Sequence, residues 1–142
     1  MPRLLRLFAA PLVLALLAAC GGTDEPAPPP VVTCGTTADS GPLTVGAQPT
    51  CGTVVWLNGL NTYTFTSGAA GTYTVTVWTT YGDADLIVVG PVGLVGDSFN
   101  TPPAWVDRVS FPATAPTLYS VDIEDANFTG AYSTYAVQVT SP

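Results

Sequence analysis

The strongest constraint on the fold is a two-residue alternation of apolar and hydroxyl-bearing side chains that recurs through most of the chain. In residues 62–66, Tyr63 and Phe65 alternate with threonines, and residues 72–77, 118–124 and 135–139 repeat the pattern. A period of two is typical of a β-strand with one face in the core and the other in water. Threonine suits the wet face because its branched Cβ packs well on a pleated surface. These four segments therefore predict strands.

Four more strands are expected at residues 42–45, 53–57, 84–89 and 105–111, with a long loop between residues 89 and 104. Turns rich in glycine, proline and asparagine separate the segments at intervals of about ten residues. No segment keeps the 3.6-residue period of a helix. The sequence therefore predicts an all-β fold, an antiparallel, jelly-roll-like β-sandwich of seven to eight strands.

The N-terminus has the form of an export signal. Arg3 and Arg6 precede an apolar run over residues 7–19, which is shorter than the roughly 20 residues of a membrane-spanning helix. The run ends in Leu-Ala-Ala-Cys20, which resembles the lipobox of bacterial lipoproteins. That resemblance implies a signal peptide at 1–19 and lipidation of Cys20. Because Gly21 follows in place of an aspartate, it also implies an outer membrane lipoprotein of the bacterial cell envelope. The alternative is an ordinary signal peptide with a chance cysteine.

Residues 20–33 are expected to form a tether after the lipidated cysteine. Four prolines, at 26, 28, 29 and 30, favour an extended and semi-rigid backbone. We interpret the segment as a spacer, and the alternative is a proline-rich ligand for another domain. Residues 34–142 are then the folded domain.

Cys34 and Cys51 form an even pair once Cys20 carries a lipid. Disulfides persist in exported proteins, so we expect a bond between them. It would fasten the start of the domain. In the chain-entropy model, closing a loop of this size stabilises the folded state by about 3 kcal/mol. The alternative is a reactive thiol pair, although no basic side chain lies nearby in the sequence to lower a thiol pKa.

Charge and missing residue types exclude several functions. The chain has no histidine or lysine, and after residue 19 a single arginine faces ten acidic residues, a net charge of −9. Nucleic acid is excluded as a partner because nothing would neutralise its phosphates. Ser-His-Asp and Cys-His nucleophile systems, Schiff-base chemistry and histidine-based zinc sites are also excluded. We therefore expect a protein that is not an enzyme.

Two acidic groups are candidate sites. Asp83 and Asp85 flank a turn, where they would cap backbone amides, perform acid–base work or bind calcium. Asp122, Glu124 and Asp125 form an oxygen-rich strand end, which suits either calcium or water. No other cofactor is expected.

Aromatic residues supply a further candidate. Trp78 shares its parity with Thr74 and Thr76 and should face outward, with Tyr81 close behind. The two rings would stack on a sugar or a peptide, or lie beneath the 89–104 loop. By the same reasoning Trp105 belongs in the core, and Arg108 pairs with Asp107 at the surface.

In order, the strands resemble the bacterial pre-peptidase C-terminal (PPC) domain. The resemblance rests on residues 43–46, 61–65, 71–75, 105–111, 118–121 and 135–139, and above all on Asp83-Ala-Asp-Leu86. It implies a β-sandwich that accompanies a catalytic partner, and relatives that bind collagen use calcium. Two departures stand out: Asn61 replaces a common aspartate, and no protease precedes the domain.

The function expected is therefore a non-catalytic, surface-anchored lipoprotein. It would attach to the membrane through its lipid and serve as a binding or accessory module for an exported protein or a polysaccharide. The alternatives are a structural envelope lipoprotein without a dedicated ligand and a carboxylate-based hydrolase. The hydrolase would need two carboxyls across a cleft, in a domain with little room for one.

Overall fold

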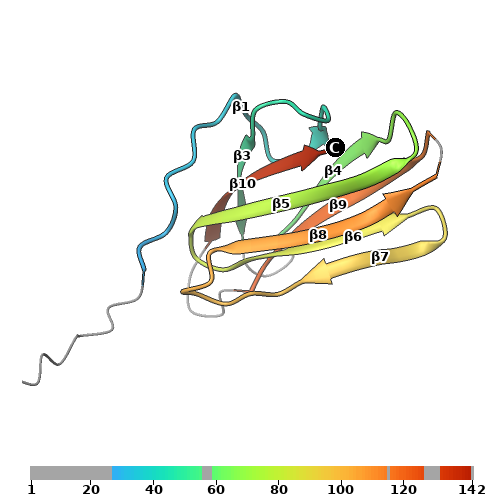
Figure 1. Ribbon diagram of the computed structural model, residues 1–142. Helices are drawn as coiled ribbons and strands as arrows, with labels where there is room; N and C mark the ends of the chain where they lie inside the picture. The colour runs from blue at the N-terminus through green and yellow to red at the C-terminus, as the bar shows by residue number, and fades with distance from the viewer. Residues whose placement is uncertain (1–26, 56–58, 115, 127–131, 142) are drawn as a thin grey trace, which may run out of the picture.

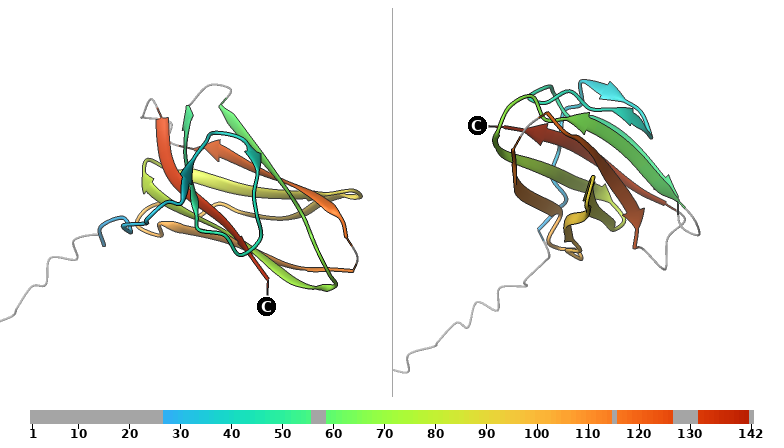
Figure 2. Two further views of the ribbon diagram at one scale, coloured as in Figure 1. Left: turned by 90° about the horizontal axis from the view of Figure 1, so that it is seen from above. Right: turned by 90° about the vertical axis from the view of Figure 1, so that its right-hand side faces the viewer.

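The computed structural model describes residues 27–55, 59–114, 116–126 and 132–141. All helices and strands assigned in these ranges are strands, and none is a helix. The same ranges contain no helix long and apolar enough to cross a membrane. Two sheets pack face to face as a sandwich, which Figures 1 and 2 show from three directions. The all-β sandwich prediction is confirmed.

Each sheet has five strands. Sheet A has the order β1 (Thr36–Thr37), β3 (Thr50–Val55), β10 (Tyr132–Thr140), β5 (Gly71–Tyr81) and β8 (Val106–Ala113). Sheet B has the order β2 (Gly41–Pro42), β4 (Leu60–Thr66), β9 (Leu118–Asp125), β6 (Ala84–Gly90) and β7 (Gly93–Ser98). The short strands β1 and β2 pair in parallel with β3 and β4, and the remaining pairs are antiparallel.

The strand count of ten exceeds the seven to eight that we predicted. One added strand is β1, and the other is β7, which occupies part of the predicted 89–104 loop. Its glycines at 93 and 96 look like turn residues in the sequence, but Gly96 lies in the sheet, where a Cβ would come 2.8 Å from the Val109 side chain. The expected strand at 42–45 is shorter than predicted, because only Gly41 and Pro42 pair with β4.

The core lies between the sheets and follows the predicted alternation. Tyr63 and Phe65 of β4 are buried, and the inward residues of the other three alternating strands are buried with them. Aromatic rings fill one part of this core: Phe65 stacks on Tyr119 with ring centroids 5.2 Å apart, and Phe111 lies 4.8 Å from Tyr119. Burial of these faces is the main stabilising contribution.

A hydrogen-bonded pair of buried tyrosines joins the two sheets. The hydroxyl of Tyr63 in sheet B lies 2.9 Å from that of Tyr135 in sheet A. The Asn61 amide donates to the Tyr135 hydroxyl at 2.7 Å and to the Thr53 carbonyl at 2.8 Å. Burial raises the pKa of both tyrosines, so both hydroxyls stay protonated. We call this the tyrosine bridge. It explains the departure at position 61, because an aspartate there would lack the two N–H donors.

The start of the domain is fastened as expected. Cys34 and Cys51 form a disulfide across a Cα–Cα distance of 5.7 Å, which confirms the predicted bond.

Trp105 is half-buried rather than in the core, and its indole nitrogen donates to the Ala27 carbonyl at 2.7 Å. The prediction for Trp105 was wrong because the residue lies just before β8 begins. The predicted lipidation site, Cys20, lies outside the described residues.

Candidate functional site

One end of the sandwich gathers acidic side chains from three strands and a turn. Asp107 of β8 is fully buried. Its Oδ1 accepts hydrogen bonds from the Ser98 hydroxyl at 2.7 Å and from the backbone amide of Asn100 at 2.9 Å. The predicted surface pair of Asp107 with Arg108 is wrong. Neighbouring residues of a strand point to opposite faces, so Asp107 enters the core while Arg108 is exposed.

The turn before β6 is tied to the strands beside it. The Asp83 amide donates to the Ser133 hydroxyl at 2.8 Å, and that hydroxyl donates to Asp125 Oδ1 at 2.6 Å. The Ala126 amide donates to the Asp83 carbonyl at 2.8 Å. The backbone of Asp83 and the side chain of Asp125 therefore have a structural role, whereas within the described residues no hydrogen bond from a backbone amide to the Asp83 or Asp85 carboxylate supports the capping that we weighed for them.

The carboxyls at this end raise one another's pKa. The pKa of Asp85 rises to about 7, first because of burial and then because of the charges of Asp83, Asp107, Glu124 and Asp125. Burial also raises the pKa of Asp83, with Asp107 and Asp125 adding to it. Burial raises the pKa of Asp107 as well, against the hydrogen bonds that it accepts. Arg108 is exposed and points away from these carboxyls, so its positive charge does not offset the rise in their pKa.

The structure brings together some of the predicted calcium ligands but not all of them. Asp85 lies opposite Glu124 in the β6–β9 register, and Asp83 and Asp125 act on it electrostatically. Asp122 lies apart, where it accepts from the Thr62 and Ser120 hydroxyls at 2.8 and 3.0 Å. Within the described ranges, no three acidic, histidine or cysteine side chains are placed to hold one metal ion. Calcium at these residues stays a prediction.

Sequence reasoning missed Asp107, although the parity that placed Val109 inward also applied to it. Carboxylate oxygens suit calcium chemically. Three carboxylate oxygens at this end of the sandwich are buried without a hydrogen-bond partner: Asp83 Oδ1, Asp85 Oδ1 and Asp107 Oδ2.

An exposed aromatic pair lies at the same end of sheet A. Tyr81 of β5 and Tyr132 of β10 are 53% and 42% exposed, and their ring centroids are 5.2 Å apart with 33° between the planes. A register shift leaves Thr80 as an extra residue in β5, so that Tyr81 lies opposite Thr134. Trp78, our other stacking candidate, is half-buried. Tyr132 was not predicted, because its ring meets Tyr81 only through the pairing of β5 with β10.

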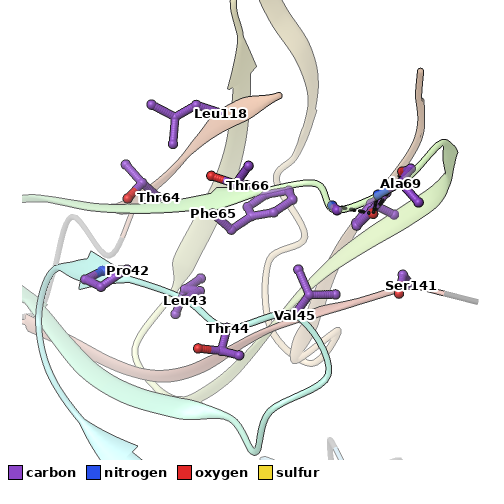
Figure 3. Close-up of a pocket in the computed structure, with 12 residues that line it drawn as sticks. Pro42, Leu43, Thr44, Val45, Thr64, Phe65, Thr66, Ala69, Leu118 and Ser141 are labelled. Carbon is purple, nitrogen blue, oxygen red and sulfur yellow. Dashed lines mark hydrogen bonds between the residues drawn. The ribbon is translucent and has the colours of Figure 1, made fainter. Parts of the chain in front are cut away.

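A groove lies at the opposite end of the sandwich, where β4 ends (Figure 3). The chain after β2 crosses here from sheet B to sheet A: the Leu43 amide donates to the Thr64 carbonyl at 2.7 Å and the Gly46 amide to the Val139 carbonyl at 2.8 Å. The space that this crossing leaves beside β4 has a volume of about 640 Å³. Its described lining consists of threonines, Ser141, Tyr73 and apolar residues, with no charged side chain. No sequence signal indicated it, because its walls come from distant segments.

Comparison with known proteins adds information on the fold. No protein-family model matches the chain, and no curated protein matches it in sequence. Among solved structures, the pre-peptidase C-terminal domain of collagenase from Bacillus anthracis is similar at a TM-score of 0.58 and 13% identity, over 70% of this chain and 93% of that one.

Two other solved structures are less similar. PliG of Salmonella Typhimurium, a periplasmic inhibitor of g-type lysozyme, has a TM-score of 0.47 at 14% identity, over 72% of this chain and 97% of its own. A family 35 carbohydrate binding module from an environmental isolate has a TM-score of 0.41 at 16% identity, over 84% and 90% of the two chains. The likeness to the pre-peptidase C-terminal domain shows that this chain has the β-sandwich fold that the resemblance implied.

Proposed function

We propose that the protein is a non-catalytic binding module of the bacterial cell envelope, anchored by a lipid on Cys20, which holds a neutral polysaccharide at the Tyr81–Tyr132 pair. The observation that carries the proposal is the exposure of two aromatic rings that adjoin each other, whereas the aromatic residues of the core are buried. Exposed aromatic residues that adjoin one another mark binding surfaces more often than isolated ones.

The surroundings of the pair suit a sugar. The apolar C–H faces of a pyranose stack on aromatic rings, while sugar hydroxyls need donors and acceptors at the rim. Thr80 and Thr134 supply hydroxyls beside the pair, with Oγ1 atoms 2.8 Å apart. The net charge of −9 that follows residue 19 disfavours an anionic glycan.

A binding role also fits the placement of the acids better than hydrolysis does. Glycoside hydrolysis uses two carboxyls set about 5–10 Å apart on either side of the scissile bond. The groove lining contains no carboxyl, and Asp107 is buried within the fold. The absence of histidine and lysine removes the common nucleophile systems.

The test is affinity electrophoresis of the full chain in gels that contain neutral polysaccharides. We expect retardation of the wild type and about a tenfold weaker interaction for Tyr81→Ala and Tyr132→Ala, a loss of the size expected for one stacked ring. Phe99→Ala is the matched control, because Phe99 is an aromatic residue of similar exposure, 55%, outside the pair. It should leave retardation unchanged.

Other outcomes would overturn the proposal. If no neutral polysaccharide retards the wild type but one exported protein is captured from an envelope extract through Tyr81, the ligand is a protein. If neither binds, the protein is a structural envelope component. Turnover of a glycan that is lost on changing one acid would make it a carboxylate-based hydrolase.

A further inference from the structure

Residues 27–34, which we name the strap, do not behave as a free spacer. Pro30, Val32 and Cys34 are half-buried, whereas Val31, Thr33 and Gly35 between and after them are exposed, Val31 fully. This alternation means that one side of an extended segment rests on the domain. In Figure 1 the strap, in blue, rises along the end of the sandwich where β5 ends and β10 begins.

The strap is held at both of its ends. At residue 27, the Trp105 indole nitrogen donates to the backbone carbonyl at 2.7 Å. At residue 34, the disulfide joins the strap to Cys51 of β3. Trp105 lies directly before β8, and Cys51 lies in β3. The two attachment points are therefore toward opposite edges of sheet A, with β5 and β10 between them.

The strand register identifies the residues of sheet A that lie between these two attachment points. Val106 of β8 pairs with Trp78 of β5, Trp78 with Ala136 of β10, and Ala136 with Cys51 of β3. We call these four residues the row. Three strand spacings of about 4.8 Å make the row about 14 Å wide. Seven residue steps of about 3.1 Å give the strap a reach of about 22 Å, enough to cross it.

The burial of Ala136 agrees with such a crossing. Its neighbours Tyr135 and Val137 point into the core, so its own side chain points to the outside of sheet A. Nevertheless Ala136 is fully buried, and it is not part of the core cluster. Ala136 lies between Trp78 and Cys51 on this face, and a strap held at Trp105 and Cys51 is placed to help cover it.

The chemistry of the row and of Trp105 fits an extended proline-rich peptide. Such peptides form preorganised helices of the polyproline II type that dock on aromatic surfaces, where they lose little conformational entropy and expose their carbonyls as acceptors. Trp105 supplies an indole donor to a carbonyl, and Trp78 supplies a half-buried ring on the path. The row itself carries no charge.

We propose that the row on the outer face of sheet A is a recognition surface for an extended proline-rich peptide, and that the strap is its occupant within the same chain. The sequence offered two interpretations of the prolines, a spacer or a ligand for another domain. In this proposal the segment is a ligand for its own domain, with Pro30 on the docked side and Pro28 and Pro29 exposed.

The test compares two neighbouring valines in the full chain labelled with 5-fluorotryptophan, with resonances assigned by single Trp→Phe replacements. Val32→Asp places a charge on the docked side of the strap, and Val31→Asp places the same charge on the exposed side. We expect the Trp78 and Trp105 fluorine resonances of Val32→Asp to shift toward the values of exposed tryptophan. The spectrum of Val31→Asp should match the wild type, and both variants should keep the wild-type circular dichroism.

A synthetic peptide with the sequence of residues 26–33 then probes the surface in trans. At millimolar concentration it should return the Trp78 and Trp105 resonances of Val32→Asp to their wild-type positions. The wild type should need at least about tenfold more peptide to respond, because its own strap competes at a high effective concentration. Equal spectra for the two variants, or no response of Val32→Asp to the peptide, would overturn the proposal.

Discussion

Replacing Gly52 by alanine should destabilise the domain strongly, because the added methyl group would strike the tyrosine bridge. An ideal Cβ at this position would lie 2.5 Å from the Tyr135 hydroxyl oxygen and 2.7 Å from that of Tyr63. Real Cβ contacts are not this short, so the hydroxyls must move. They are buried and hydrogen-bonded to each other, and that of Tyr135 also accepts from Asn61, so a shift breaks bonds that no water replaces.

The magnitude follows from two contributions. Overpacking of a well-packed core costs about 1–3 kcal/mol, and each buried hydrogen bond that breaks costs about 1 kcal/mol. We therefore expect Gly52→Ala to lower the free energy of unfolding by about 3 kcal/mol, a large part of the roughly 5–15 kcal/mol of a typical domain. Gly68→Ala is the matched control: a Cβ there meets nothing within 4 Å, and it should change stability by less than about 0.5 kcal/mol.

Urea unfolding of the two variants and of Tyr135→Phe provides the assay. Removing the Tyr135 hydroxyl creates room for the new methyl group, so the double variant Gly52→Ala/Tyr135→Phe should lose at least about 1 kcal/mol less than the sum of the single changes. Additive losses, or a Gly52→Ala as mild as Gly68→Ala, would refute the contact of Gly52 with the bridge.

The remaining predictions concern the acidic end and the N-terminus. Because the pKa of Asp85 is raised from 3.8 to about 7 in the folded state, the folded protein binds the proton more tightly than the unfolded one, and the free energy of unfolding should fall as pH rises from about 4 through 7. After discounting for the partial exposure of Asp85, we expect a fall of about 1–2 kcal/mol in urea titrations, kept in the exposed control Asp97→Asn and smaller in Asp85→Asn, where the raised pKa values of Asp83 and Asp107 leave part of it. Calcium at ten times its dissociation constant should raise stability by about 1.4 kcal/mol in thermal unfolding, and an equal shift with magnesium would indicate charge screening alone. Intact-mass analysis of membrane-extracted protein should give a chain that starts at Cys20 and carries acyl groups, whereas a soluble mature form with a free Cys20 thiol would contradict the lipid anchor.

The sequence predicted the fold class because burial on one face leaves a repeating mark. Tyr63 and Phe65 could be assigned inward positions from their spacing alone, and the structure agrees. The disulfide followed from counting cysteines in a chain that we predicted to be exported. Both inferences depend on local patterns, which a single sequence contains.

Edge strands and strand ends were harder to predict. In β7, only Val95 packs against the core, and glycines interrupt the strand, so no alternation was visible. Asp107 had the parity of a core residue, but we placed it at the surface as the partner of Arg108. The hydrogen bonds that keep it inside come from Ser98 and Asn100, which belong to the segment that we had assigned to a loop.

The candidate sites depend on pairings that the sequence does not contain. Tyr81 was predicted, but its partner Tyr132 is 51 residues away and reaches it only because β10 lies beside β5. The strap likewise looked like an isolated tether until the bond from Trp105 to Ala27 placed it on the domain. Neither association has a local signal, because each depends on the tertiary arrangement.

The way in which the two sheets end bears on aggregation. At one side of the sandwich each sheet stops at a two-residue strand, β1 or β2, too short to template a further chain. At the other side, the register shift between Val88 and Val89 disturbs the pairing of β7, and β8 carries Pro112, which has no amide hydrogen to donate. Long, regular free edges are the usual route by which β-proteins polymerise, and these four edges are either short or locally interrupted. A protein concentrated on a surface is therefore less prone to pair edge to edge with its neighbours.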